Sequence, residues 1–126
     1  QPHLLLKLTN SQGEVVRLFK PEKKQKLPIQ PATLDTLRMA LQDVVIRGTA
    51  KNAGLEAYKV AGKTGTAETG RQKDNHAWFA GYAPYDSPRY CFVILVEHTP
   101  GHGAEIAGPI AKELMSYLFP ELNPAS

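Results

Sequence analysis

Tyr58-Lys59-Val60-Ala61-Gly62-Lys63-Thr64-Gly65-Thr66-Ala67-Glu68 is the most informative part of this chain. Its pattern predicts a strand over Tyr58 to Ala67. Within that strand, Lys63 supplies a cation, and two threonines on either side of Gly65 supply hydroxyl groups. A site for a small anionic acyl substrate needs these groups. We therefore expect an exposed strand that also forms one wall of a substrate site.

Two further strands are expected after this one. The segment His76 to Ala83 alternates two sets of side chains, as a strand of a sheet does. The segment Tyr90 to Glu97 is apolar without a break through Val96, which predicts a strand covered on both faces and therefore the central one. Because the links between the strands are short, antiparallel neighbours in a meander are the simplest arrangement.

Two amphipathic helices are expected, one before and one after these strands. Apolar residues recur at steps of three and four from Thr33 onward, and Gly48 is placed to end that helix in the left-handed conformation. The second helix follows Gly103, has Pro109 in its first turn, and stops before Pro120. The apolar stripes are Leu34, Leu37, Leu41, Val44 and Val45 in the first helix, and Ala107, Ile110, Ala111, Leu114, Met115 and Leu118 in the second. The expected fold class is α+β, an antiparallel sheet flanked by helices.

The amino-terminal part of the chain predicts a separate β-hairpin. Strand-like runs at 4–8 and 14–19 flank a polar turn that ends in Gly13, so a hairpin is expected within residues 1–20. A charged, proline-bearing connection then runs to Pro31. A chain of 126 residues with 42% hydrophobic content is long enough for one core and too short for two ordinary domains. We therefore expect residues 1–126 to form one unit.

Composition limits the partners. The formal net charge is +3, from 15 basic and 12 acidic residues, and so mild an excess suits anionic partners without requiring nucleic acid. The sequence holds no run of about 18 apolar residues, so we expect no membrane segment in this chain, although an anchor could precede it in a longer protein. Cys91 is the single cysteine, and its apolar surroundings predict a buried, unreactive thiol.

Lys-Thr-Gly is one of three sequence elements of active sites that form serine acyl-enzymes, the others being Ser-x-x-Lys and a Ser-x-Asn type triplet. The serines of this chain are Ser11, Ser87, Ser116 and Ser126, and none begins either element. The candidate catalytic residue is Lys63, and the candidate substrate-binding residues are Thr64, Gly65 and Thr66. The amide of Thr66 would serve as an oxyanion donor. The nucleophile has no candidate in this chain.

Other kinds of site fit the sequence less well. A phosphate-binding loop ending at Gly62-Lys63-Thr64 would need glycine at position 57, which is Ala57. A metal site at His98, His102 and Glu105 is conceivable, but glycines and Pro100 favour a strand-to-helix turn there. His76 has no acid or nucleophile near it in sequence, which favours a polar strand start over a catalytic base. We expect no metal and no organic cofactor.

Four segments agree in order and spacing with one known family. They are Gly48-Thr49-Ala50, the Lys63 strand, His76-Ala77-Trp78-Phe79-Ala80-Gly81-Tyr82-Ala83-Pro84 and Phe92-Val93-Ile94-Leu95-Val96-Glu97. Together they resemble the carboxy-terminal part of the transpeptidase domain of class B penicillin-binding proteins, of the penicillin-binding protein 2 type. The resemblance covers about Gln30 to Phe119, and the amino-terminal hairpin matches less specifically.

The resemblance implies a partial penicillin-binding protein/serine β-lactamase-like fold within a peptidoglycan D,D-transpeptidase. Such a protein would cross-link D-Ala-D-Ala stem peptides through an acyl-enzyme, bind β-lactam antibiotics, and act on the extracytoplasmic face of the cytoplasmic membrane. By the same resemblance, Lys63 is the lysine of the family motif, and Thr66 supplies an oxyanion amide and binds the terminal carboxylate. This chain lacks the nucleophile and would need the remainder of the domain as its partner. A non-catalytic β-lactam-sensing or interaction module of the same fold is the alternative.

Overall fold

The computed structural model describes residues 5–20, 27–70 and 74–123. The chain divides into two compact units, Gln1–Gln30 and Pro31–Ser126. No helix in these described ranges is long and apolar enough to cross a bilayer.

The first unit contains the expected hairpin. Strands β1 (Lys7–Thr9) and β2 (Val15–Leu18) pair antiparallel. Asn10 shapes the turn, because its side-chain oxygen accepts hydrogen bonds from the amides of Gln12 and Glu14. The hairpin is therefore confirmed with shorter strands than expected, while position 4 of the first expected strand lies outside the described residues.

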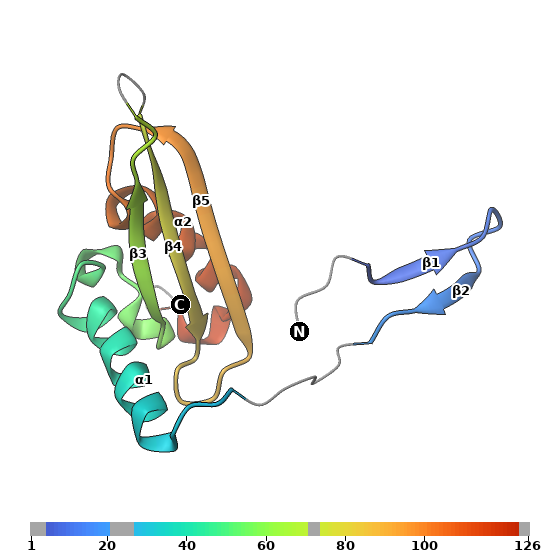
Figure 1. The fold of residues 1–126 in the computed structure, drawn as a ribbon, viewed down its shortest axis with the longest axis horizontal. Coiled ribbons are helices and arrows are strands. Elements are labelled where there is room, and N and C mark those ends of the chain that lie inside the picture. The colour runs from blue at the N-terminus through green and yellow to red at the C-terminus, as the bar shows by residue number, and fades with distance from the viewer. Residues whose placement is uncertain (1–4, 21–26, 71–73, 124–126) are drawn as a thin grey trace. The chain divides into compact units, whose positions relative to one another are not determined.

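The second unit contains a three-stranded antiparallel meander, as expected (Figure 1). Its strands are β3 (Ala61–Ala67), β4 (Asn75–Ala83) and β5 (Tyr90–Thr99), in the order β3-β4-β5. The first strand begins at Ala61 rather than Tyr58. Tyr58 instead ends a 3-10 turn, η2 (Glu56–Tyr58), and Lys59 follows in the left-handed region with φ 52°. That conformation breaks the extended backbone and delays the strand.

The expectation of a central, fully covered β5 was wrong. Strand β4 is central, and β5 lies at the edge of the sheet. Phe92 and Ile94 of β5 pack against the core, whereas Val93 and Leu95 on its other face are 65% and 41% exposed. Cys91 shares that outer face and is exposed, so its expected burial was also wrong. An unbroken apolar run does not distinguish a strand covered on two faces from one covered on a single face.

The two expected helices are α1 (Pro31–Ile46) and α2 (Gly103–Leu118). Gly48 follows α1, but the described glycines in the left-handed region are Gly13, Gly54 and Gly70. Glycine is required at position 48 for a different reason. A Cβ there would lie 2.7 Å from the Cα of Val44, so a side chain would collide with the last turn of α1. The expected left-handed cap at Gly48 was therefore wrong.

Pro109 lies deeper in α2 than expected. Because the helix begins at Gly103, this proline falls in the second turn rather than the first. Proline has no amide hydrogen, so it cannot donate the helical hydrogen bond that the Glu105 carbonyl would otherwise accept. The first turn carries Glu105, whose carboxylate accepts a 3.4 Å hydrogen bond from the amide of His102. The negative charge of Glu105 thus lies at the positive, amino-terminal end of the helix, where it is stabilising.

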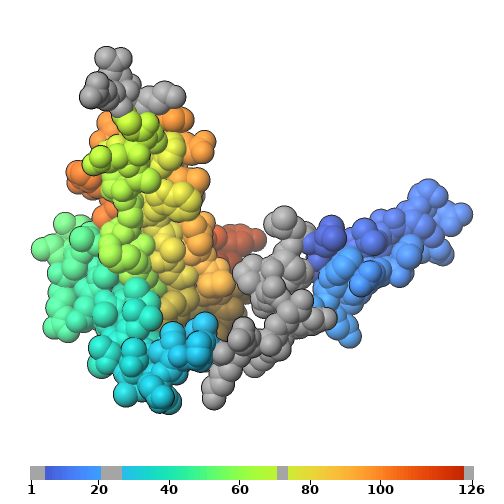
Figure 2. Space-filling view, viewed as in Figure 1, coloured from blue at the N-terminus to red at the C-terminus, as the bar shows by residue number. Residues whose placement is uncertain are grey.

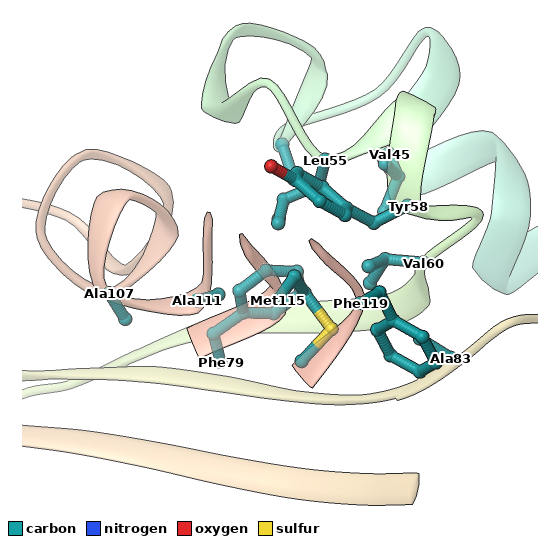
Figure 3. Close-up of a cluster of buried hydrophobic side chains, with 11 residues drawn as sticks. Val45, Leu55, Tyr58, Val60, Phe79, Ala83, Ala107, Ala111, Met115 and Phe119 are labelled. Atoms are coloured by element: carbon teal, nitrogen blue, oxygen red, sulfur yellow. The ribbon is translucent and has the colours of Figure 1, made fainter. Parts of the chain in front are cut away.

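The core lies between the sheet and α2 (Figure 3). Phe79 of β4 meets Met115 of α2 there, and Phe119 follows the helix into the same cluster. Segment 47–60, including η1 (Lys51–Ala53) and η2, adds Leu55 and Tyr58 from the side. The short turn η3 (Pro120–Leu122) closes the chain after α2. Burial of these large side chains fixes where β3 and the start of α2 meet.

Among the described residues, no helix covers the opposite face of the sheet. Figure 2 shows atoms of β3, β4 and β5 on the visible surface, with the green-to-orange colours of those strands. Trp78 is 37% exposed on that face, beside the outward-facing Val93 and Leu95. This group of three residues is called the open sheet face below.

Candidate functional site

A hollow of about 800 Å³ lies where β3, the segment after α1 and the first turns of α2 come together. Lys63, Thr64, Gly65 and Thr66 all line it. Strand β3 is an edge strand, with β4 on one side and no strand on the other among the described residues. The structure therefore brings the four candidate residues together on one open border, although their roles stay predictions.

Lys63 is exposed, and its ammonium lies along that border. Its Nζ donates a 2.6 Å hydrogen bond to the carbonyl of Thr64. In an antiparallel pair, a residue directs both of its backbone groups either toward its partner strand or away from it, and alternate residues share a direction. The carbonyl of Thr64 and the amide of Thr66 therefore point to the same side of β3. We expect that side to be the open border, which would then offer a positive charge and a backbone donor.

Thr64 points toward the helix-covered face of the sheet. It lies opposite Phe79, a core residue, and is 9% exposed. Its hydroxyl oxygen is 2.8 Å from the hydroxyl oxygen of Thr49, and either group can be the donor. Thr49 lies in the turn after α1 and lines the same hollow. The hydroxyl of Thr64 is therefore anchored from outside the sheet.

Thr66 is held by the start of α2. Its hydroxyl accepts a 3.3 Å hydrogen bond from the amide of Gly103, the first residue of the helix. Gly103 packs directly on the backbone of β3, since a Cβ there would lie 2.6 Å from the Trp78 carbonyl and closer still to the Gly65 carbonyl. Both threonines are thus fixed on one face, and Lys63 projects from the other because strand side chains alternate.

Gly65 leaves an unobstructed surface between these groups. A Cβ at this position would meet the Cβ of Trp78 at 3.4 Å, which is ordinary van der Waals contact. The fold therefore does not require glycine here for internal packing. A bare backbone instead permits another chain to approach the strand closely.

Among the other sequence candidates, His102 and Glu105 line the hollow, whereas His76 and His98 lie outside it. The ring Nδ1 of His76 accepts a 3.1 Å hydrogen bond from the amide of His98, and their ring centroids are 4.8 Å apart. Neither histidine lines the hollow. Ser116 uses its hydroxyl to donate to the Glu113 carbonyl within α2. Across the described residues, no three His, Cys, Asp or Glu side chains gather as a metal site would need.

Thr49 and Gly103 are site residues that sequence reasoning missed. The segment Gly48-Thr49-Ala50 was read as a helix end, and Gly103 as part of a turn. Only the packing of α1 and α2 against β3 brings these two residues to the hydroxyls of Thr64 and Thr66.

Comparison with known proteins identifies the family. A family model described as "Penicillin binding protein transpeptidase domain" matches residues 1–116. The chain belongs to the penicillin-binding protein transpeptidase family. The expected resemblance to class B members is confirmed by relatives and structures of that kind.

One such relative of this penicillin-binding protein chain is Stage V sporulation protein D of Bacillus subtilis. It is 37% identical over 107 residues, which are 79% of this chain and 17% of that protein. The D,D-transpeptidase domain of a peptidoglycan glycosyltransferase from Eggerthella lenta superposes with a TM-score of 0.70 and 29% identity, covering 92% of this chain and 26% of that one.

Penicillin-binding protein 2 of Pseudomonas aeruginosa, solved in complex with WCK 5153, superposes with a TM-score of 0.65 and 33% identity. The match covers 79% of this chain and 23% of that structure. The chain thus spans about a quarter or less of each protein compared. The α+β assignment and the partial penicillin-binding fold are confirmed.

Proposed function

We propose that this chain is the carboxy-terminal portion of a peptidoglycan D,D-transpeptidase and supplies the Lys63 wall of its acyl-transfer cleft. The observation that carries this proposal is the placement of Lys63, Thr64, Gly65 and Thr66 on one open strand border above a hollow. The serine nucleophile belongs to the remainder of the domain. The complete protein, with that remainder, is called the parent below.

In the parent, the serine oxygen attacks the carbonyl carbon between the two D-Ala residues of a stem peptide. The bond to the terminal D-Ala breaks, that residue leaves as a free amine after gaining a proton, and an acyl-enzyme remains. The amine of a second stem peptide then attacks the carbonyl carbon of the acyl-enzyme and forms the cross-linking amide bond. The ester bond to the serine breaks, and the proton lost by the amine returns to the serine oxygen. This chemistry runs on side chains and backbone groups alone. A β-lactam enters the same path, because its ring amide acylates the serine.

Each candidate residue has a role in that path. Lys63 attracts the substrate carboxylate and tunes proton transfer beside the nucleophile. The open-side amide of Thr66 donates to the oxyanion, a contribution of about 3 kcal/mol in comparable sites. Gly65 lets the substrate backbone lie alongside β3 as an added strand. The Thr64 hydroxyl helps to bind the carboxylate from the wall of the hollow.

The remainder of the domain is the partner that this chain requires. Trp78, Val93 and Leu95 give the open sheet face an apolar surface, which suits burial against another part of the same domain. Because peptidoglycan lies outside the cytoplasmic membrane, the parent acts on the extracytoplasmic side of that membrane.

Fluorescent penicillin tests the proposal on a denaturing gel. We expect covalent labelling of the parent and none of this chain alone. The variant Lys63→Met should lower the rate of parent labelling by roughly a hundredfold, the scale of a lost proton-transfer group. Lys51→Met is the matched control, since Lys51 is exposed and does not line the hollow.

A labelled band from this chain alone would place a nucleophile within it and refute the division of roles. An unlabelled parent would refute the transpeptidase and favour the interaction module that binds no β-lactam. Equal effects of the Lys63 and Lys51 variants would remove Lys63 from the site.

A further inference from the structure

The contact between Thr49 and Thr64 joins the turn after α1 to strand β3. The two hydroxyl oxygens are 2.8 Å apart, and both residues line the hollow beside Lys63. Thr64 belongs to the Lys-Thr-Gly motif on β3, whereas Thr49 lies in the turn after α1. The pair connects the helix end to the strand at the site itself.

The backbone around Thr49 is held firmly. On one side, the amide of Gly48 donates to the Asp43 carbonyl at 2.7 Å, and no side chain fits at position 48. On the other side, Ala50 is fully buried and its amide donates to the Val44 carbonyl at 2.9 Å. Thr49 therefore presents its hydroxyl from a fixed point, and a β-branched side chain adds little freedom of its own.

When two hydroxyl groups form one hydrogen bond with each other, one of their two O–H donors is not used in that bond. Each hydroxyl has one O–H donor and two acceptor lone pairs. Whichever threonine donates to the other, the second O–H is not used within the pair. Because both residues line the hollow, that remaining donor is available to an anion held there by Lys63. Without Thr49, the Thr64 hydroxyl would rotate freely or turn its proton to a backbone acceptor.

We propose that Thr49 is a positioning residue for carboxylate recognition, orienting the Thr64 hydroxyl so that the pair directs one O–H into the hollow. This inference rests on the proposed function, since it assumes that the hollow receives a substrate or β-lactam carboxylate. It adds to that function a residue outside the Lys-Thr-Gly motif. Thr49 touches Thr64 and acts through it.

The competing explanation is that the Thr49–Thr64 hydrogen bond only stabilises the fold. This purely structural role, called a staple below, and the positioning role make different predictions. A staple supports β3 for every ligand, so its loss lowers reaction with all ligands equally. A residue that orients a donor for a carboxylate matters only when the ligand carries that carboxylate. The experiment therefore compares benzylpenicillin with its neutral methyl ester, which keeps the reactive ring and lacks the charge.

The experiment measures the acylation rate constant of the parent with both ligands. Thr49→Val keeps the shape of the side chain and removes the hydroxyl. We expect it to lower the rate constant for benzylpenicillin by about three- to tenfold, the scale of one lost hydrogen bond, and to leave that for the ester nearly unchanged. Thr49→Ser should restore most of the acid-to-ester ratio. Thr36→Val is the matched control, because the Thr36 hydroxyl donates to the Ala32 carbonyl on α1 away from the hollow.

A second arm combines Thr49→Val with Thr64→Val. If Thr49 acts through Thr64, the double variant should show the same ratio as Thr64→Val alone. The ratio is internal to each preparation, so partial unfolding of a variant lowers both rate constants and leaves the ratio unchanged.

Equal losses for acid and ester, an unaffected Thr49→Val protein, or additive effects in the double variant would each overturn the inference while leaving the transpeptidase intact. A wild-type parent that neither ligand acylates would overturn the proposed function and this inference together.

Discussion

The amide of Gly103, where α2 begins, donates a hydrogen bond to the hydroxyl of Thr66 on β3 at 3.3 Å. The contact leaves no room for a side chain on the glycine, because the backbone of Gly65 and the carbonyl of Trp78 occupy that space. Helix α2 therefore packs directly against β3 at the point where the oxyanion amide of Thr66 is expected. The same contact therefore contributes to the stability of the fold and to the geometry of the site.

Replacing Gly103 by alanine should destabilise the fold. An added methyl group must push α2 away from β3, and overpacking of this kind costs about 1–3 kcal/mol of the free energy of unfolding. Urea unfolding followed by circular dichroism measures the change. An unchanged midpoint would show that the helix start has more freedom than its contacts indicate.

Replacing Gly65 by alanine should leave the stability of the fold nearly unchanged but lower the reaction with penicillin. The new Cβ has room beside Trp78, so the free energy of unfolding should change by less than about 1 kcal/mol. The methyl group would nevertheless stand where a substrate strand must approach, and fluorescent penicillin labelling of the parent should fall by about a hundredfold, as small misplacements at reacting centres do. Normal labelling of a stable Gly65→Ala parent would contradict the role of Gly65.

The Lys59–Asp86 pair should give stability a defined pH window. The two side chains meet at 2.6 Å. Their hydrogen bond is the largest cause that raises the pKa of Lys59 and lowers the pKa of Asp86. Because the Asp86 pKa is lowered, the stability that it contributes is lost as the pH falls through that lowered pKa. Because the Lys59 pKa is raised, the stability that it contributes is lost as the pH rises through that raised pKa. The contribution is thus full between about pH 4 and pH 10.

Melting temperatures of wild type and Asp86→Asn, measured within this window and beyond both of its ends, test it. The difference should be small, because both side chains are about half exposed, and it should disappear below the lowered pKa of Asp86 and above the raised pKa of Lys59. A difference that persists below the lowered Asp86 pKa would assign the effect to something other than the ion pair. Lys59→Met should trace the same curve.

The open sheet face should make the isolated chain self-associate. Trp78, Val93 and Leu95 expose apolar surface that the remainder of the domain would otherwise cover. Val93→Lys places a charge on this face and should shift light scattering toward the monomer. Tyr117→Lys is the control, since Tyr117 is 82% exposed on α2 rather than on the sheet. A wild-type chain that stays monomeric over a wide concentration range would contradict this expectation.

Local patterns were enough to predict much of this fold. The alternation in β4, the apolar stripes of both helices and the glycine-ended turn of the hairpin each depend on residues close together in sequence. The same patterns misplaced β5, because burial on one face or two depends on what packs against the strand. They also misplaced Pro109, because α2 already begins at Gly103 and this proline falls in its second turn.

The sequence by itself determined the family and the motif residues, because the Lys-Thr-Gly segment and its neighbouring segments occur in the order and spacing typical of that family. It also determined that no serine of the chain begins an active-site element. Only the tertiary structure decided which groups support that motif. Thr49 and Gly103 lie 15 and 37 residues from the threonines whose hydroxyls they bond, and such pairings come from burial of the core between sheet and helices. No local pattern records them, since hydrogen bonds between distant residues follow from packing.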